Sequence, residues 1–361
     1  MKYPELTGLA ERCGRIIDEN IEFLQSLNQQ LGSRTESDIR DILRELRICY
    51  RNIAFVEAYG IPVLYYSQTT EMKYLNKLIF KIYQEIHYPL DHPAVACLST
   101  KYYYFFPFTN VIFVPISETS FLLHLSDIYH ELGHGVLFNK DNHPKLTELN
   151  EKYNEIIENI TLHYEQAIIR TSRDAGPNNI PRLLKLIQYQ WKTYWVDEFL
   201  SDLFALYTLG PAYAYSHLHI TTKISRNIYE FSPMFPKSHP SDDARMRMLC
   251  IALKRTGFHD RANDVISKWN SMPFVQTDQP SVDYPHVYPE ILLENMVNLF
   301  LDGLLKCEFP IIVPQMLNEL GENDIRKLLN NAWDKFWVNP NEFRRWEEKT
   351  IEKIKAEYQK D

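Results

Sequence analysis

The sequence has little glycine, no surplus of basic residues and no long apolar run. Its 361 residues include 11 glycines, against 23 tyrosines and 19 phenylalanines, and 45% of them are hydrophobic. This composition predicts an ordered globular protein and argues against disorder. The formal net charge is −8. A protein that binds nucleic acid needs a basic face against the phosphates, so we expect no nucleic-acid partner.

The chain also lacks the signals for secretion and for crossing a membrane. Its N-terminal residues do not contain the uninterrupted apolar core of a secretory signal. The most apolar stretch, 291–305, is interrupted by Glu294, Asn295, Asn298 and Asp302, which is typical of an amphipathic helix. We therefore expect no membrane span.

The five cysteines are odd in number, widely scattered and without a CxxC pair. A small secreted domain would have an even set that forms a disulfide framework. The pattern instead predicts reduced thiols in a cytoplasmic protein. The residues are Cys13, Cys49, Cys97, Cys250 and Cys307.

Most of the chain predicts helices, because apolar residues recur three and four positions apart with charged residues between them. Short β-branched or aromatic runs, punctuated by prolines, predict a few strands. The fold class is therefore mainly α with a small mixed β-sheet (α+β). The expected helices cover 4–31, 37–59, 145–170, 181–209, 241–256 and a stretch from about Ser120. The expected strands are Ile61–Tyr66, Ala94–Ser99, Tyr102–Phe106 and Val111–Pro115, with a turn at 33–35 and a loop at 174–179.

One stretch, Pro273–Pro289, has four prolines and no convincing period. It is the best candidate for a boundary or a long surface crossing. The sequence therefore predicts an N-terminal helical segment at 1–60, a catalytic domain at 61–272 and a C-terminal helical segment at 273–361.

Residues 130 to 134 read His-Glu-Leu-Gly-His. On a helix, positions i and i+4 lie on one face, roughly 6 Å apart along the axis, so two imidazoles at this spacing can bind one zinc ion. Glu131 is rotated off that face but stays beside the metal, where it can take a proton from metal-bound water. The motif predicts one Zn²⁺, with His130 and His134 as ligands and Glu131 as general base. The alternative is a buried helix with two hydrogen-bonded histidines.

The sequence around this motif favours a helix with a close neighbour. Thr119 or Ser120 is the expected cap, and apolar residues follow from Phe121 onward. Gly133 and Gly135 are poor helix formers, and we expect their small size to let another element approach the site closely.

A catalytic zinc site needs a third protein ligand. The metzincin pattern would place glycine at position 137 and histidine at position 140, where the chain has Leu137 and Lys140. The gluzincin pattern needs a glutamate on a later helix. Among the glutamates that follow, only Glu198 has an aspartate four residues on, Asp202. We predict Glu198 as the third ligand, with Glu155 as the fallback.

The spacing of Glu198 and Asp202 places both carboxylates on one helix face. A histidine that binds metal normally donates its other ring N–H to a carboxylate, which sets the tautomer and the orientation of the ring. We therefore expect Asp202 to accept a hydrogen bond from a ligand histidine, and His130 is the favoured donor. The alternative is that both carboxylates belong to the solvated face of an amphipathic helix.

A third motif, His239-Pro-Ser-Asp-Asp-Ala-Arg245, leads into a helical stretch that Ser241 or the adjacent aspartates can cap. In metal-assisted peptide hydrolysis, a protonated histidine or an arginine can stabilise the oxyanion of the tetrahedral intermediate. We therefore predict His239 and Arg245 as catalytic residues; the alternative is a loop histidine and a surface arginine. A second hypothesis is that His239 occupies the fourth position on zinc in a resting state.

The order of these motifs, HExxH, then ExxxD, then HPxxxxR, resembles the metallopeptidase family of the CAAX prenyl protease and the bacterial heat-shock protease HtpX. The resemblance extends from Val111 to Arg245. It implies a zincin-like core with extra flanking helices, zinc held by His130, His134 and Glu198, and His239 and Arg245 near the scissile carbonyl. The best-known members are integral to membranes, so the chain would belong to a soluble branch.

The resemblance also implies that the strand at 110–115 lies before the catalytic helix and pairs one edge with the substrate backbone. An internal strand without a ligand role is the alternative. Further residues follow the Glu198 helix and are assigned to packing or surface positions rather than to the site. They are Tyr213, Tyr215, His217 and His219.

Together these features predict a zinc metallopeptidase, most simply a metalloendopeptidase, whose partners are a protein or peptide substrate and a regulatory protein. Two alternatives stay open: a non-catalytic zinc-containing scaffold or regulatory protein, and a zinc hydrolase of a non-peptide amide. Structural zinc needs no base and usually has four closed protein ligands, so the presence of Glu131 favours an enzyme.

Overall fold

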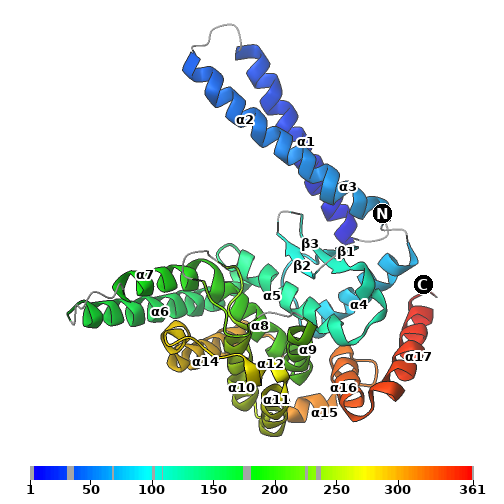
Figure 1. Cartoon of the computed structure of the whole chain (residues 1–361). Helices are drawn as coiled ribbons and strands as arrows, with labels where there is room; N and C mark the ends of the chain where they lie inside the picture. The colour runs from blue at the N-terminus through cyan, green and yellow to red at the C-terminus, as the bar shows by residue number, and fades with distance from the viewer. Residues whose placement is uncertain are drawn as a thin grey trace. The chain divides into compact units, whose positions relative to one another are not determined.

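The computed structural model describes residues 4–30, 36–66, 69–99, 102–107, 109–173, 180–223, 227–232 and 237–359. The protein is mainly helical with a small mixed sheet, as the sequence predicts (Figure 1). The expected turn at 33–35 and loop at 174–179 lie outside the described residues.

The chain divides into two compact units. One unit comprises Met1–Phe80, Asp91–Thr119 and Lys355–Asp361, and the other comprises Lys81–Leu90 and Ser120–Ile354. The boundaries of these units differ from those of the expected segments 1–60, 61–272 and 273–361. The assignment of those three segments as domains stays a prediction.

The first unit begins with two long helices, α1 (Pro4–Gln30) and α2 (Glu36–Phe55), which form an antiparallel hairpin (Figure 1). Asn52 Nδ2 on α2 donates a hydrogen bond to Asn20 Oδ1 on α1 at 3.4 Å. Leu9 and Cys13 of α1 belong to the same buried cluster as residues of the sheet. The other helices of this part of the chain are η2 (Val56–Gly60), α3 (Ile61–Tyr66), α4 (Thr70–Glu85) and η3 (Ile116–Ser120).

The expected strand Ile61–Tyr66 is wrong, because this segment is helix α3. The π-helical turn η2 carries the chain from α2 directly into α3. Pro62 is the second residue of α3 and directly follows the π-helical turn, where the regular helical hydrogen bonding is interrupted. A short apolar run does not by itself distinguish a strand from a buried helix. Val63 is fully buried against the core of the unit, which favours the helix here.

The sheet has the order β1-β3-β2 and contains β1 (Ala94–Ser99), β2 (Tyr104–Phe106) and β3 (Val111–Pro115). β1 pairs in parallel with β3, with Ala94 opposite Val111, and β2 pairs antiparallel with β3, with Phe106 opposite Val111. β3 is buried along its length and is paired on both sides. The expected pairing of this strand with substrate is therefore wrong, and the internal-strand alternative is confirmed.

The second unit is built around α8 (Val196–Leu209), of which every residue except Asp197 is buried. Helix α5 (Asp127–Asn139), which carries the HExxH motif, packs against α8. Helices α9 (Pro211–Lys223) and α10 (Asp242–Arg255) also pack against α8. The remaining helices are η4 (Leu123–Ser126), η5 (Pro144–Leu146), α6 (Thr147–Arg173), α7 (Ile180–Gln190), η6 (Trp191–Trp195), α11 (His259–Ser271), α12 (Pro273–Thr277), α13 (Tyr284–Val287), α14 (Glu290–Lys306), α15 (Pro314–Glu319), α16 (Ile325–Val338) and α17 (Pro340–Gln359).

Two expected helix starts have different outcomes. The start near Ser120 is wrong: the 3₁₀ turn η4 comes first, and α5 begins at Asp127 without a capping hydrogen bond from the side chain of Ser126. The cap of α10 is confirmed, because Ser241 Oγ accepts a hydrogen bond from Ala244 N at 3.3 Å.

The corner between α8 and α9 depends on a residue from the C-terminal part of the chain. Gly210 has φ of 93°, a conformation that suits glycine. Asn330 on α16 donates to Leu209 O at 2.8 Å and accepts from Ala212 N at 2.9 Å. These bonds satisfy backbone groups at the end of α8 and the start of α9. The corner places α9 beside the motif helices.

The stretch 273–289 contains the short helices α12 and α13, and the chain on both sides of it belongs to the second unit. Its tyrosines stabilise the start of α10, since Tyr284 and Tyr288 hydroxyls contact Ser241. Among the described residues, no helix has the length and apolarity that a membrane crossing requires. All five cysteines lie in described parts of the chain, and none of them forms a disulfide.

Candidate metal centre

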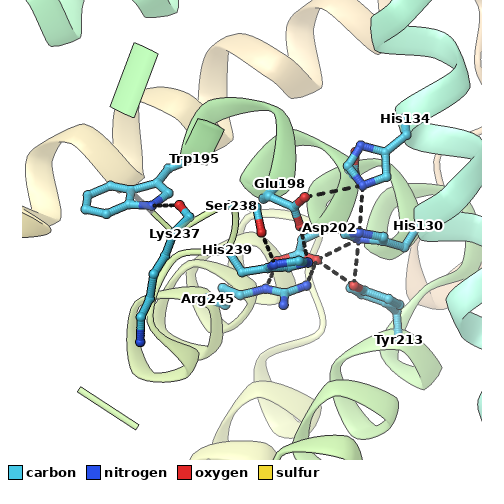
Figure 2. A network of polar contacts seen from close by, with 11 residues as sticks. His130, His134, Trp195, Glu198, Asp202, Tyr213, Lys237, Ser238, His239 and Arg245 are labelled. Carbon is cyan, nitrogen blue, oxygen red and sulfur yellow. Dashed lines mark hydrogen bonds and ion pairs between the residues drawn. The ribbon is translucent and has the colours of Figure 1, made fainter. Parts of the chain in front are cut away.

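Three side chains from two helices converge on one point: His130 and His134 of α5, and Glu198 of α8 (Figure 2). The two imidazole Nε2 atoms are 3.1 Å apart. Glu198 Oε2 lies 3.7 Å from His130 Nε2, and Glu198 Oε1 lies 3.6 Å from His134 Nε2. Two ligand atoms that are each about 2.0–2.1 Å from one zinc ion lie roughly 3.3 Å apart at the tetrahedral angle. The observed separations therefore suit a single small cation.

The close approach of α5 and α8 makes this convergence possible. A Cβ atom on Gly133 would lie 2.9 Å from the Cα atom of Ser201 and 3.2 Å from Phe204 Cβ. A larger residue would push α8 away from α5, and Glu198 would move away from the histidines. The expectation that a glycine of the motif allows a close neighbour is confirmed for Gly133.

Both histidine rings are held through their Nδ1 atoms. His130 Nδ1 lies 2.9 Å from Asp202 Oδ1, which is the contact that the Glu198–Asp202 spacing predicts. His134 Nδ1 lies 3.1 Å from Ser201 Oγ. Because Asp202 is an acceptor, the proton of His130 belongs on Nδ1, and its Nε2 lone pair is then directed at the convergence point.

Asp202 is fully buried and is surrounded by donors (Figure 2). Arg245 binds it with two hydrogen bonds, from Nε to Oδ2 at 2.7 Å and from Nη2 to Oδ1 at 2.6 Å. The Tyr213 hydroxyl donates to Oδ1 at 2.5 Å and lies 3.0 Å from His130 Nδ1. A carboxylate with this many donors is held in its charged form and in one orientation.

The pKa shifts follow from burial and from this ion pair. Burial acts to raise the pKa of Asp202, but Arg245 outweighs it and holds the pKa well below its usual value. Burial acts to lower the pKa of His130, but the Asp202 carboxylate outweighs it and raises the pKa. Burial lowers the pKa of His134 well below its usual value, and the neighbouring His130 acts in the same direction. Burial raises the pKa of Glu198.

The chemistry of the donor set fits zinc. Glu198 Oε2 is a buried carboxylate oxygen without a hydrogen-bond partner in the described structure. The two oxygens of this carboxylate face the Nε2 atoms of His130 and His134, which are close enough to repel each other if both present lone pairs. A divalent cation satisfies all three acceptors at once, and two imidazoles with one carboxylate are a common ligand set for zinc.

Glu131 is buried on α5, one residue after His130. After burial and Asp202, the negative charge of Glu131 also acts on the pKa of His130 and raises it. The structure therefore places Glu131 beside the cluster, as the motif predicts, while its role as a base stays a prediction.

The structure separates the two residues of the third motif. Arg245 is buried and engages the Asp202 carboxylate with both of its bonds, so its contacts are those of a positioning residue and not of an oxyanion ligand. The His239 side chain is 51% exposed, and its Nε2 atom lies 3.3 Å from Glu198 Oε2. His239 contacts the Glu198 carboxylate but is not part of the three-residue donor cluster.

Tyr213 is the residue that sequence reasoning missed. The sequence predicts a packing or surface position for it, yet its hydroxyl contacts both His130 and Asp202. Its only signal in the sequence is its place on the helix after Glu198, which Tyr215 and His219 share. Tyr215 instead donates to Asp264 at 2.6 Å, and His219 Nδ1 lies 2.9 Å from His124 Nε2.

Glu155 and His217 are not part of the cluster of His130, His134 and Glu198. The fallback ligand Glu155 is on α6, where it pairs with Lys152 at 2.8 Å. His217 is fully buried, and burial lowers its pKa to about 4. It is therefore a neutral packed histidine, as the sequence predicts.

Comparison of the chain with protein-family models, with curated proteins and with solved structures gives no match.

Proposed function

We propose that this chain is a zinc metallopeptidase, most simply a metalloendopeptidase, that hydrolyses peptide bonds in a protein or peptide substrate. The observation that carries the proposal is the convergence of His130, His134 and Glu198 on one point beside Glu131. A site with three protein ligands and an adjacent carboxylate is typical of catalytic zinc, whereas structural zinc usually has four closed protein ligands.

Each residue around the site has its own role in the proposed hydrolysis. Zinc bound by the three ligands supplies a Lewis acid that makes water nucleophilic near neutral pH. Glu131 accepts the proton of the attacking water and delivers it to the leaving amine. His239, exposed beside Glu198, stabilises the negative charge that develops on the carbonyl oxygen. Asp202 holds His130 so that Nε2 stays available for binding.

The proposal includes membership of the family of the CAAX prenyl protease and HtpX, in a soluble branch, because the motifs occur in the order of that family. It also includes a cytoplasmic setting, which the five cysteines without disulfides support. A regulatory protein partner belongs to the proposal too, since a cytoplasmic protease needs controlled access to its substrates.

The decisive experiment compares the parent chain with Glu131→Gln. We expect both proteins to bind one zinc ion, as measured by metal analysis. Hydrolysis of a peptide library, read out by mass spectrometry of the cut sites, should fall by about 10²–10⁴-fold in Glu131→Gln, because the general base is lost. Glu155→Gln changes an exposed glutamate on α6 in the same way and should retain parental activity.

Each rival function predicts a different pattern in that experiment. A zinc scaffold predicts zinc in both proteins and no hydrolysis of any peptide by either one. A hydrolase of non-peptide amides predicts cleavage of small amides, lost in Glu131→Gln, with every peptide intact. Equal peptide hydrolysis by the parent and by Glu131→Gln would sink the assigned role of Glu131.

A further inference from the structure

The α1–α2 hairpin of the first unit has an exposed apolar stripe along α2. Ile39, Leu43, Tyr50 and Ile53 are 51%, 51%, 73% and 37% exposed, and the half-buried Leu46 lies between them. Successive members are four, three, four and three residues apart. This alternation is the seam of a helix that packs against another helix in a coiled-coil manner.

A matching stripe runs along α1. Ile17 and Ile21 are 40% and 47% exposed, and the half-buried Leu24 continues the spacing of four and three. The stripe is distinct from the residues that α1 buries inside its own unit, such as Leu9 and Cys13. Each helix of the hairpin therefore has two apolar stripes, one buried and one exposed.

The two exposed stripes lie on the same side of the hairpin. At about 100° per residue, each exposed stripe is rotated by roughly 70–80° from the buried stripe of its own helix, in the same sense. Helices α1 and α2 run antiparallel (Figure 1). An equal rotation in the same sense therefore turns both stripes toward one face. We name this surface the docking face. It comprises Ile17, Ile21, Leu24, Ile39, Leu43, Leu46, Tyr50 and Ile53.

Charged rows of opposite sign border the docking face. The outer flank on α1 is acidic on balance and the outer flank on α2 is basic, and all the side chains concerned are exposed. Both rows lie about one residue step, near 100°, from the stripe that they flank. The acidic row is Glu11, Asp18 and Glu22, with one exposed arginine, Arg15, among them, and the basic row is Arg40, Arg44, Arg47 and Arg51.

We propose that the docking face binds the same face of a second copy of this chain and forms a four-helix bundle. A two-fold axis along the helices places α1 of one copy against α2 of the other. Asn20 and Asn52 are in contact and so lie at the same height on the hairpin, which means that the 18–22 part of the acidic row meets the 47–51 part of the partner's basic row. The other two-fold arrangement places α1 against α1 and brings like charges together. The charge pattern therefore selects the partner and its orientation.

This inference concerns a surface that the proposed metal chemistry does not use, and its test needs no activity. Analytical ultracentrifugation of the full chain between about 1 and 100 µM measures the monomer–dimer equilibrium. We expect a dimer whose dissociation constant rises roughly 100-fold or more in the double variant Ile21→Glu/Leu43→Glu, since the interface contains each residue twice. Ile169→Glu changes an exposed apolar residue on α6 in the same way and should dimerise like the parent.

A charge-reversal pair tests the orientation. Asp18→Arg/Glu22→Arg makes both rows basic, and Arg47→Glu/Arg51→Glu introduces acid into the basic row. Each variant alone should be monomeric. An equimolar mixture should form a heterodimer, because a basic α1 then meets an acidic α2 and the parental contact is kept on the other side.

Two results would overturn the proposal. One is a parent chain that stays monomeric over the whole concentration range, which includes the case of a face reserved for a different protein. The other is a dimer that Ile21→Glu/Leu43→Glu does not weaken while circular dichroism shows an unchanged helix content.

Discussion

At the residue scale, the orientation of His130 depends on the groups around its Nδ1 atom. Asp202 accepts from this ring, and Arg245 and Tyr213 both donate to the same carboxylate. The carboxylate of Asp202, which accepts from the His130 ring, is already balanced by the positive charge of Arg245. The buried Arg245–Asp202 pair is therefore neutral overall. This arrangement leaves the charge of Glu198 available for the proposed zinc ion.

The hydroxyl of Tyr213 should therefore matter for metal affinity. In Tyr213→Phe, Asp202 keeps its two bonds from Arg245 but loses one donor, and the His130 ring is held less firmly. We expect zinc affinity, measured by competition with a chelating dye, to fall roughly 10-fold or more. Tyr215→Phe removes a hydroxyl from the same helix that contacts Asp264, and it should bind zinc like the parent. Equal affinities of the two variants would contradict the role.

Glu85 predicts a dependence of stability on pH. Its carboxylate oxygens accept from Ile325 N at 3.0 and 3.1 Å, and burial raises its pKa to about 7. The folded protein thus holds this proton more tightly than the unfolded chain. The contribution to stability is complete at low pH and is lost as pH rises through the window between the unfolded pKa of 4.5 and about 7.

Glu85→Gln should remove this dependence, because the amide oxygen still accepts from Ile325 and does not ionise. We expect the free energy of unfolding in urea to match the parent near pH 4 and to exceed it by about 1–2 kcal/mol near pH 8. Glu155→Gln serves as the control. A difference between Glu85→Gln and the parent that is the same at both pH values would contradict the shift.

At the element scale, the distance between α5 and α8 decides whether the site exists. Two helices approach closely only where a small residue lies at the crossing, and Gly133 is that residue. The π-helical turn η2 shows a second effect at this scale, since it turns an apolar run typical of a strand into a continuous helical segment.

Gly133→Ala should weaken both the fold and the site. The new methyl group would meet the backbone of Ser201 at 2.9 Å, so α8 must shift. We expect a loss of about 1–3 kcal/mol in the free energy of unfolding, together with weaker zinc binding. Gly14→Ala on α1 places the methyl group in open space and should leave stability unchanged or higher. If Gly133→Ala had the parental free energy of unfolding, the prediction that α8 must shift would be contradicted.

At the scale of the whole molecule, metal binding should couple to folding. The three ligands come from two helices, so the site is assembled only in the folded chain, and a ligand that binds only the folded state raises its stability. Zinc at 1,000 times its dissociation constant should add about 4 kcal/mol to the free energy of unfolding of the metal-free protein. This gain should appear as a rise of several degrees in Tm. Glu198→Gln should show a much smaller rise. A parental Tm that zinc does not change would contradict a preformed site.

The C-terminal part of the chain contributes to the site from a distance. Asn330 satisfies backbone groups on both sides of the corner between α8 and α9, and that corner brings Tyr213 to Asp202. The C-terminal helical segment is thus part of the support of the candidate centre.

The amino-acid sequence by itself determined what depends on helical periodicity. The i, i+4 spacing of His130 and His134, and of Glu198 and Asp202, places each pair on one face whatever the rest of the chain does. The prevalence of helix and the positions of the three strands followed from local patterns in the same way.

The tertiary structure alone decided which faces meet. Arg245 contacts Asp202, Tyr213 contacts Asp202 as well, and β3 is an internal strand. The physical reason is that these contacts join elements far apart in the sequence. Their geometry depends on helix crossings, corners and volumes that no local period encodes.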